Sequence, residues 1–98
     1  MVLQIQLTSH LAQLFLIEKE KKIKEHSFPI DTDLSKKLLI EIDAFLKESH
    51  RDPFSLERVE CVCDSAGFTT ERIGETITNT YNFILEMKKS KLHEKENI

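Results

Sequence analysis

Two cysteines, Cys61 and Cys63, stand one residue apart, and closely spaced thiolates are ligands that zinc prefers. The apolar pattern around them predicts a helix, on which two residues of this spacing point about 200° apart. Both sulfur atoms could then not reach one tetrahedral ion. We therefore expect Cys63 to be a small core residue, Cys61 to lie near the core boundary, and no metal or other cofactor to be bound.

Histidine is the side chain that serves most often as general acid or base in enzymes. The chain has four, spread along its length at His10, His26, His50 and His93. No pair has the spacing of three or four residues that brings side chains together on a helix. A glycine-rich phosphate loop and a serine-centred nucleophile motif are also absent from the sequence. We therefore expect no catalytic residues and no enzymatic activity.

The stretch from Val62 to Ile77 has residue types that can join two packed helices. Ala66 is small enough for a close crossing, Gly67 suits a turn with positive φ, and Phe68 can lock the two helices together. This stretch resembles the DNA-binding helix-turn-helix superfamily. The run Ala-Gly-Phe-Thr in particular is similar to the turn of bacterial repressors and arabinose-regulator-type activators.

The resemblance implies that the start of the second helix of this motif would enter a DNA groove. The residues that would then contact DNA are Thr69, Thr70, Arg72 and Asn79. Arginine suits guanine, asparagine suits adenine, and threonine hydroxyls suit phosphates or base edges. Glu71 and Glu75 lie on the same surface, and the formal net charge is -3. Because acidic groups repel phosphates, DNA binding is the alternative hypothesis.

The preferred hypothesis is a small regulatory or adaptor protein that acts by binding another protein. Acidic charge and long amphipathic helices suit this role. Tyr81, Phe83 and Met87 span more than one face of the expected last helix, and one small core would not cover them all. These three residues are the predicted surface for a protein partner or for a second copy in a homodimer.

Length and composition fit one small domain. The 98 residues are 40% hydrophobic and 32% charged, which allows one modest core with a solvated surface. Two Gly and two Pro are too few for the many tight turns of an all-β fold. No apolar run is long enough to span a membrane, and no disulfide framework of a secreted domain is present. We expect no membrane association and a cytoplasmic location.

The spacing of apolar residues predicts an all-α domain, 1–98, with a helix-turn-helix-like pair at its end. The four expected helices and the frayed tail cover residues 3–26, 32–50, 53–66, 69–92 and 93–98. The clearest is the second helix, where Leu34, Leu38, Ile42 and Phe45 form one stripe. The third helix would begin after Asp52, a favourable cap.

The first element leaves two possibilities open. Residues Val2 to Leu7 alternate between apolar and polar as in a strand, but Leu3, Leu7, Leu11 and Leu14 also fit a helical stripe. Because no second alternating run is visible to pair with a strand, the helix is preferred.

Overall fold

The chain forms a four-stranded sheet with two helices. The structure is a computed structural model that describes residues 1–31 and 33–96, with side chains described through Lys88. Its elements are β1 (Val2–Leu7), β2 (Leu11–Glu18), β3 (Lys21–Pro29), α1 (Leu34–Glu48), a short 3-10 helix η1 (Pro53–Ser55), β4 (Arg58–Cys63) and α2 (Phe68–Glu96). This is an α/β domain, so the expectation of an all-α, four-helix domain is wrong.

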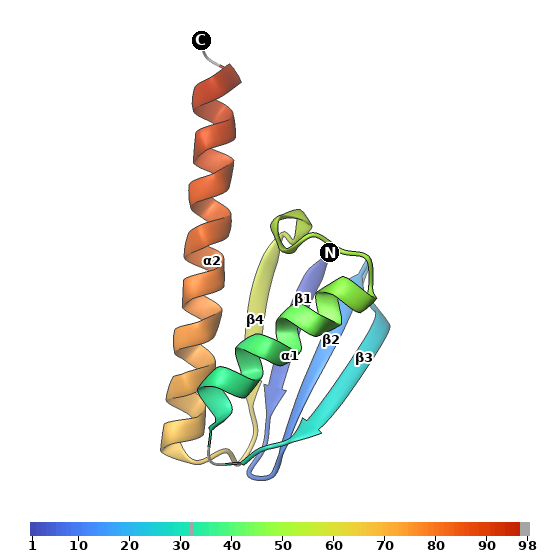
Figure 1. Ribbon diagram of the computed structural model, residues 1–98, viewed down its shortest axis with the longest axis vertical. Coiled ribbons are helices and arrows are strands. Elements are labelled where there is room, and N and C mark those ends of the chain that lie inside the picture. The colour runs from blue at the N-terminus through green and yellow to red at the C-terminus, as the bar shows by residue number, and fades with distance from the viewer. Residues whose placement is uncertain (32, 97–98) are drawn as a thin grey trace.

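The sheet has the strand order β3-β2-β1-β4 (Figure 1). The first three strands form two antiparallel hairpins, and β4 returns through α1 and η1 to pair with β1 in parallel. The expected helix over residues 3–26 is therefore replaced by β1, β2 and most of β3. Parallel pairing of β1 and β4 joins segments more than fifty residues apart, and this separation hides the pairing from local sequence patterns.

Strand β1 follows the alternation seen in its sequence. Leu3, Ile5 and Leu7 point to one face of the sheet and are fully buried. The partner strand β2 was not recognised because its apolar residues do not alternate cleanly. Leu14 is buried on the helix-covered face, while Phe15, on the opposite face, is also only 4% exposed.

The turn between β2 and β3 contains only Lys19 and Glu20, with φ values of 52° and 66°. Positive φ at both central residues is the geometry of a type I′ hairpin turn, which usually takes asparagine or glycine. Lysine and glutamate are not typical of such a turn, so Lys19 and Glu20 do not predict it from the sequence. Strand β3 is also largely exposed and rich in lysine and glutamate, so its sequence carries no core-facing pattern.

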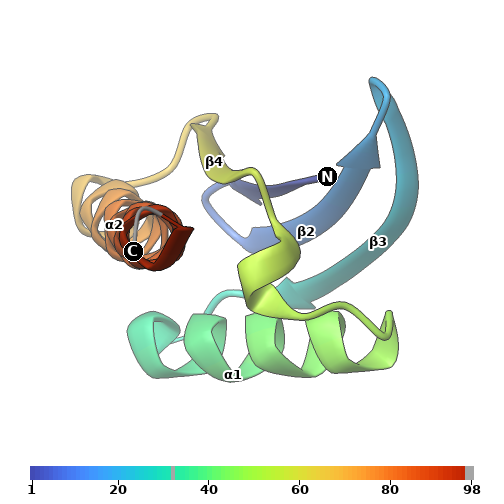
Figure 2. The same ribbon diagram turned by 90° about the horizontal axis from the view of Figure 1, so that it is seen from above.

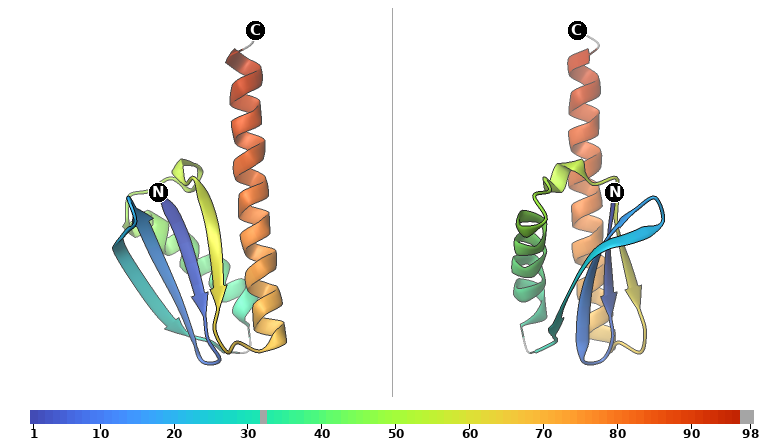
Figure 3. Two further views of the ribbon diagram at one scale, coloured as in Figure 1. Left: turned by 180° about the vertical axis from the view of Figure 1, so that it is seen from behind. Right: turned by 90° about the vertical axis from the view of Figure 1, so that its right-hand side faces the viewer.

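Helix α1 confirms the second expected helix, and it covers one face of the sheet (Figure 2). Its buried side consists of Leu34, Leu38, Ile42, Phe45 and Leu46. These residues form one core with the inward side chains of the strands. The opposite face of the sheet carries glutamines and is not covered by a helix in the described part of the chain (Figure 3).

The helix expected over residues 53–66 does not form. Asp52 does act as a cap, since its Oδ1 accepts a hydrogen bond from the Phe54 N–H at 2.9 Å, but only one 3-10 turn follows. The chain then extends into β4, where Val59, Cys61 and Cys63 lie beside the three buried residues of β1. The cysteines therefore belong to a strand and face the helices.

Candidate functional site

Helix α2 carries the largest group of exposed apolar side chains on the described surface. The packing of its inner side against the sheet determines which side chains of α2 point outwards. Ile77 and Leu85 are buried in the core, 7% and 4% exposed. Gly74 lies where the helix is close against the sheet. A Cβ built there would lie 2.6 Å from Cδ1 of Leu7 and 2.8 Å from Sγ of Cys61. Glycine therefore allows the backbone of α2 to lie directly on β1 and β4.

Asn82 ties α2 to the free edge of β4. The Val59 N–H donates a hydrogen bond to Oδ1 of Asn82 at 2.8 Å, and Nδ2 of Asn82 donates to the Val59 carbonyl at 2.9 Å. One side-chain amide thus takes the place of a neighbouring strand at this residue. The orientation of α2 about its own axis is fixed by this pair of hydrogen bonds together with the close contact at Gly74.

The outer side of α2 is exposed from Phe68 to Met87. The exposed fractions are 74% for Phe68, 63% for Phe83, 42% for Ile84 and 46% for Met87. Leu39, on the neighbouring helix α1, is 47% exposed. Large apolar side chains that gather on neighbouring elements commonly mark a surface that binds another molecule. The outer face of α2 is defined here by its exposed residues Phe68, Arg72, Thr76, Asn79, Phe83, Glu86 and Met87.

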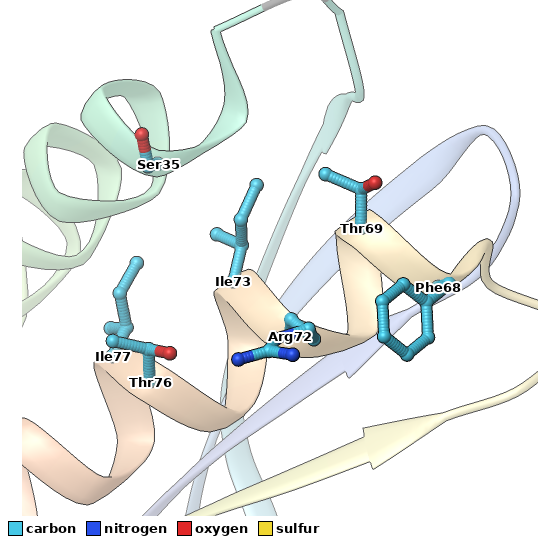
Figure 4. A pocket seen from close by; sticks show the side chains of 7 residues that line it. All are labelled: Ser35, Phe68, Thr69, Arg72, Ile73, Thr76 and Ile77. Carbon is cyan, nitrogen blue, oxygen red and sulfur yellow. The ribbon is translucent and has the colours of Figure 1, made fainter.

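A shallow hollow of about 300 Å³ lies between the first turns of α2 and the start of α1 (Figure 4). It is lined by Ser35, Phe68, Thr69, Arg72, Ile73, Thr76 and Ile77. Ile73 and Ile77 point from α2 towards α1, while the Arg72 guanidinium lies 5.6 Å from the ring of Phe68. The hollow is therefore apolar, with one cation at its rim.

The residues predicted to contact DNA all lie within the first twelve residues of α2. Thr69, Arg72 and Asn79 are exposed, and Thr70 is half-buried. The helix that should precede them is absent, because Val62 belongs to β4. Gly67 also lacks the predicted positive φ, which occurs instead at Ser65, with a φ of 59°. No helix-turn-helix forms here, so the expected support for a groove-reading helix is missing.

The three residues of the predicted partner surface do not lie on one exposed face. Phe83 and Met87 are exposed as expected, but Tyr81 is half-buried beside η1. Burial, together with the negative charge of Asp43, raises the pKa of Tyr81 above its usual range. Tyr81, with Phe54, lines a smaller apolar hollow of about 130 Å³. Tyr81 therefore contributes to packing more than to the outer face of α2.

The structure places the residues that were considered for metal binding or catalysis differently from what the sequence predicts. Cys61 and Cys63 lie on one face of β4 with their sulfur atoms 3.8 Å apart, so the helical argument against a shared ion is wrong. Nε2 of His26 lies 2.7 Å from Oε2 of Glu41 and links β3 to α1. Among the described residues, no three or more His, Cys, Asp or Glu side chains form a metal-binding group.

Comparison with known proteins identifies a similar fold. No family model and no curated protein sequence matches the chain. Among solved structures, YeaZ from Pseudomonas aeruginosa superposes with a TM-score of 0.75 at 16% sequence identity. The match covers 87% of this chain but 39% of the YeaZ chain, so this chain spans less than half of that protein. The likeness establishes the fold. None of the described helices is both long and apolar enough to cross a membrane.

Proposed function

We propose that this chain is a non-catalytic protein-interaction domain that binds through the outer face of α2, and that a second copy of the chain is a partner for this face. The observation that carries the proposal is the exposure of Phe83 and Met87, one turn apart on a helix that is anchored on its other side. A regulatory or adaptor role in the cytoplasm would use such a surface. The two free cysteines suit a reducing compartment.

The charges on the outer face of α2 are arranged so that the face complements itself. Arg72, Asn79 and Glu86 are exposed and follow one another at intervals of seven residues, which places them in one row along the helix. If two copies of α2 pair antiparallel about Asn79, Arg72 of each copy lies opposite Glu86 of the other. One symmetric contact then makes two ion pairs, as expected of a twofold interface.

The same arrangement covers apolar surface. In antiparallel pairing about Asn79, Phe83 of each copy lies beside Thr76 of the other, and Thr76 is exposed and small enough to receive a ring. Aromatic residues near the centre of an interface commonly supply most of its binding energy. Phe83 would therefore supply affinity, and the Arg72–Glu86 pairs would set the orientation.

Sedimentation equilibrium of the purified chain at low salt tests this pairing. We expect a monomer–dimer equilibrium that Phe83→Ser weakens strongly. Arg72→Glu and Glu86→Arg should each weaken dimerisation about tenfold or more, because each places like charges opposite each other twice. The double variant Arg72→Glu/Glu86→Arg should regain dimerisation, and a mixture of the two single variants should form heterodimers. Lys36→Glu, an exposed change on α1, is the matched control.

Two results would count against the proposal. A chain that stays monomeric at high concentration, or a dimer that Arg72→Glu, Glu86→Arg and Phe83→Ser all leave unchanged, would exclude this surface. Gel shifts with genomic DNA fragments at two salt concentrations test the alternative. Salt-sensitive and sequence-selective retardation that Arg72→Ala abolishes would favour DNA binding over protein binding.

A further inference from the structure

Cys61 and Cys63 form a pair of thiols that the proposed protein-binding role does not use. They occupy alternate positions of β4, so both side chains point to the face of the sheet on which α2 lies. Both are free and half-buried, and their Sγ atoms are 3.8 Å apart. Two sulfur atoms are therefore held side by side under a helix by the geometry of a single strand.

The first of these thiols is held in place by the backbone of α2. A Cβ on Gly74 would approach Sγ of Cys61 to 2.8 Å, so the helix closes over this sulfur atom and restricts its movement. Val62, between the two cysteines, points to the opposite face and is 45% exposed. The pair is thus positioned by both the strand and the helix, and preorganisation of this kind favours ligand binding.

A buried hydroxyl next to Cys61 lacks a hydrogen-bond acceptor. Thr78, one turn after Gly74, is 8% exposed, and its Oγ1 has no hydrogen-bond partner among the described residues. The hydroxyl lies near the sulfur of Cys61 without meeting the geometry of a full hydrogen bond. A thiolate at Cys61 would accept the hydrogen bond that Thr78 otherwise lacks, and an unsatisfied buried donor costs free energy.

In the free protein both cysteines are thiols, and their sulfur atoms are in contact with each other. A bound monovalent cation would replace the two thiol protons and offset one of the two thiolate charges. Closing a disulfide would also remove the protons, but it would leave the Thr78 hydroxyl without a charged acceptor.

We propose that Cys61 and Cys63, with Thr78 as hydrogen-bond donor, form a dithiolate site for a soft monovalent cation of the Cu(I) class. Thiolates select such cations over hard ones. With metal–sulfur bonds of about 2.3 Å, a sulfur separation of 3.8 Å gives an angle of about 110° at the metal. A structural zinc ion would need four protein ligands, whereas Cu(I) accepts two or three, and a neutral donor molecule from solution can provide the third.

Binding is an exchange of cations without oxidation or reduction. Two S–H bonds break, two sulfur–metal bonds form, and two protons are released for each Cu(I) bound. The charge of the site changes from zero to minus one, and the Thr78 hydroxyl then donates to the Cys61 thiolate. Metal binding should therefore tighten as the pH rises.

The test is anaerobic titration of the reduced protein with Cu(I) in competition with a chromophoric Cu(I) chelator. We expect uptake of one equivalent, with release of two protons near neutral pH. Cys61→Ser and Cys63→Ser should each weaken binding at least tenfold. Thr78→Val should keep the stoichiometry and weaken binding about tenfold, the expected loss of a hydrogen bond to a charged sulfur. Val62→Ser is the matched control and should bind as the unmodified chain does.

Circular dichroism and thermal unfolding of each variant separate a loss of binding from a loss of fold. If Cys61→Ser fails to fold, Cys63→Ser and Thr78→Val still test the site, because Cys63 stands at the end of β4 and valine has the shape of threonine. Equal Cu(I) uptake by the unmodified chain and Cys63→Ser, or equal affinity in the unmodified chain and Thr78→Val, would overturn the proposal.

Discussion

Among single residues that the structure describes, Cys61 has the most strongly shifted pKa. Its neighbours are the thiol of Cys63, the hydroxyl of Thr78, the carboxylate of Glu75 and the backbone of Gly74. Burial disfavours the charged thiolate, which is why the pKa rises. A neutral thiol in the folded state and an ionisable one in the unfolded state couple stability to pH.

We predict that the chain loses stability in alkaline solution through Cys61. Its folded pKa of about 12 lies above the unfolded value of 9.0, so its contribution is fully present below pH 9 and is lost as pH rises towards 12. Urea unfolding of the unmodified chain and of Cys61→Ala between pH 8 and pH 11 measures this. The free energy of unfolding should fall less steeply with pH in the variant. Parallel pH profiles would contradict the assignment, since Tyr81 titrates in both proteins.

At the scale of elements, the contact between α2 and the sheet depends on one glycine within the helix. An alanine at Gly74 would gain about 1 kcal/mol of helix propensity. Its Cβ, however, would lie 2.6 Å from Cδ1 of Leu7 and 2.8 Å from Sγ of Cys61. Leu7 is fully buried and has little room to move, so steric conflict should outweigh propensity.

We therefore predict that Gly74→Ala lowers the free energy of unfolding by about 1 to 3 kcal/mol. Gly67→Ala is the matched control, because nothing lies within 4 Å of the position of its Cβ and its φ is not positive. Because Gly67 is the N-cap of α2, where alanine is less favourable than glycine, that change should cost less, about 0.5 to 1 kcal/mol. Urea unfolding followed by circular dichroism checks both variants. If Gly74→Ala is as stable as Gly67→Ala, α2 does not approach the sheet as closely as described.

At the scale of the whole molecule, the sheet has a free edge on β4, and α2 closes part of it. The side chain of Asn82 satisfies both backbone groups of Val59, which a fifth strand would otherwise bond. An open strand edge is a template for pairing with other chains. Asn82 should therefore both stabilise the domain and protect this strand edge from pairing with other chains.

Asn82→Ala should lower the free energy of unfolding by about 1 to 3 kcal/mol, because it leaves two half-buried backbone groups without partners. It should also increase aggregation on mild heating, measured by light scattering. Thr80→Ala is the control, since Thr80 is exposed and its hydroxyl donates only within its own helix, to the Thr76 carbonyl. Unchanged stability in Asn82→Ala would show that water replaces the amide at no cost.

Local sequence patterns were sufficient to predict some of the elements. The stripe from Leu34 to Phe45 predicted α1, Asp52 was a cap as expected, and the helix over 69–92 lies within α2. Phe83 and Met87 were expected at the surface and are exposed. Each of these features depends on residues a few positions apart, where helical spacing and capping act directly.

Which segments form strands and pair with one another became clear only from the tertiary structure. The segment from Val2 to Leu7 fits either a helix or a strand, and it becomes a strand because β2 and a segment more than fifty residues away supply its hydrogen-bond partners. The same holds for Cys61 and Cys63, which were expected on opposite sides of a helix and lie on one face of a strand. The period of a segment can indicate a strand but does not show which distant segment it pairs with, so the thiol pair became visible only in the fold.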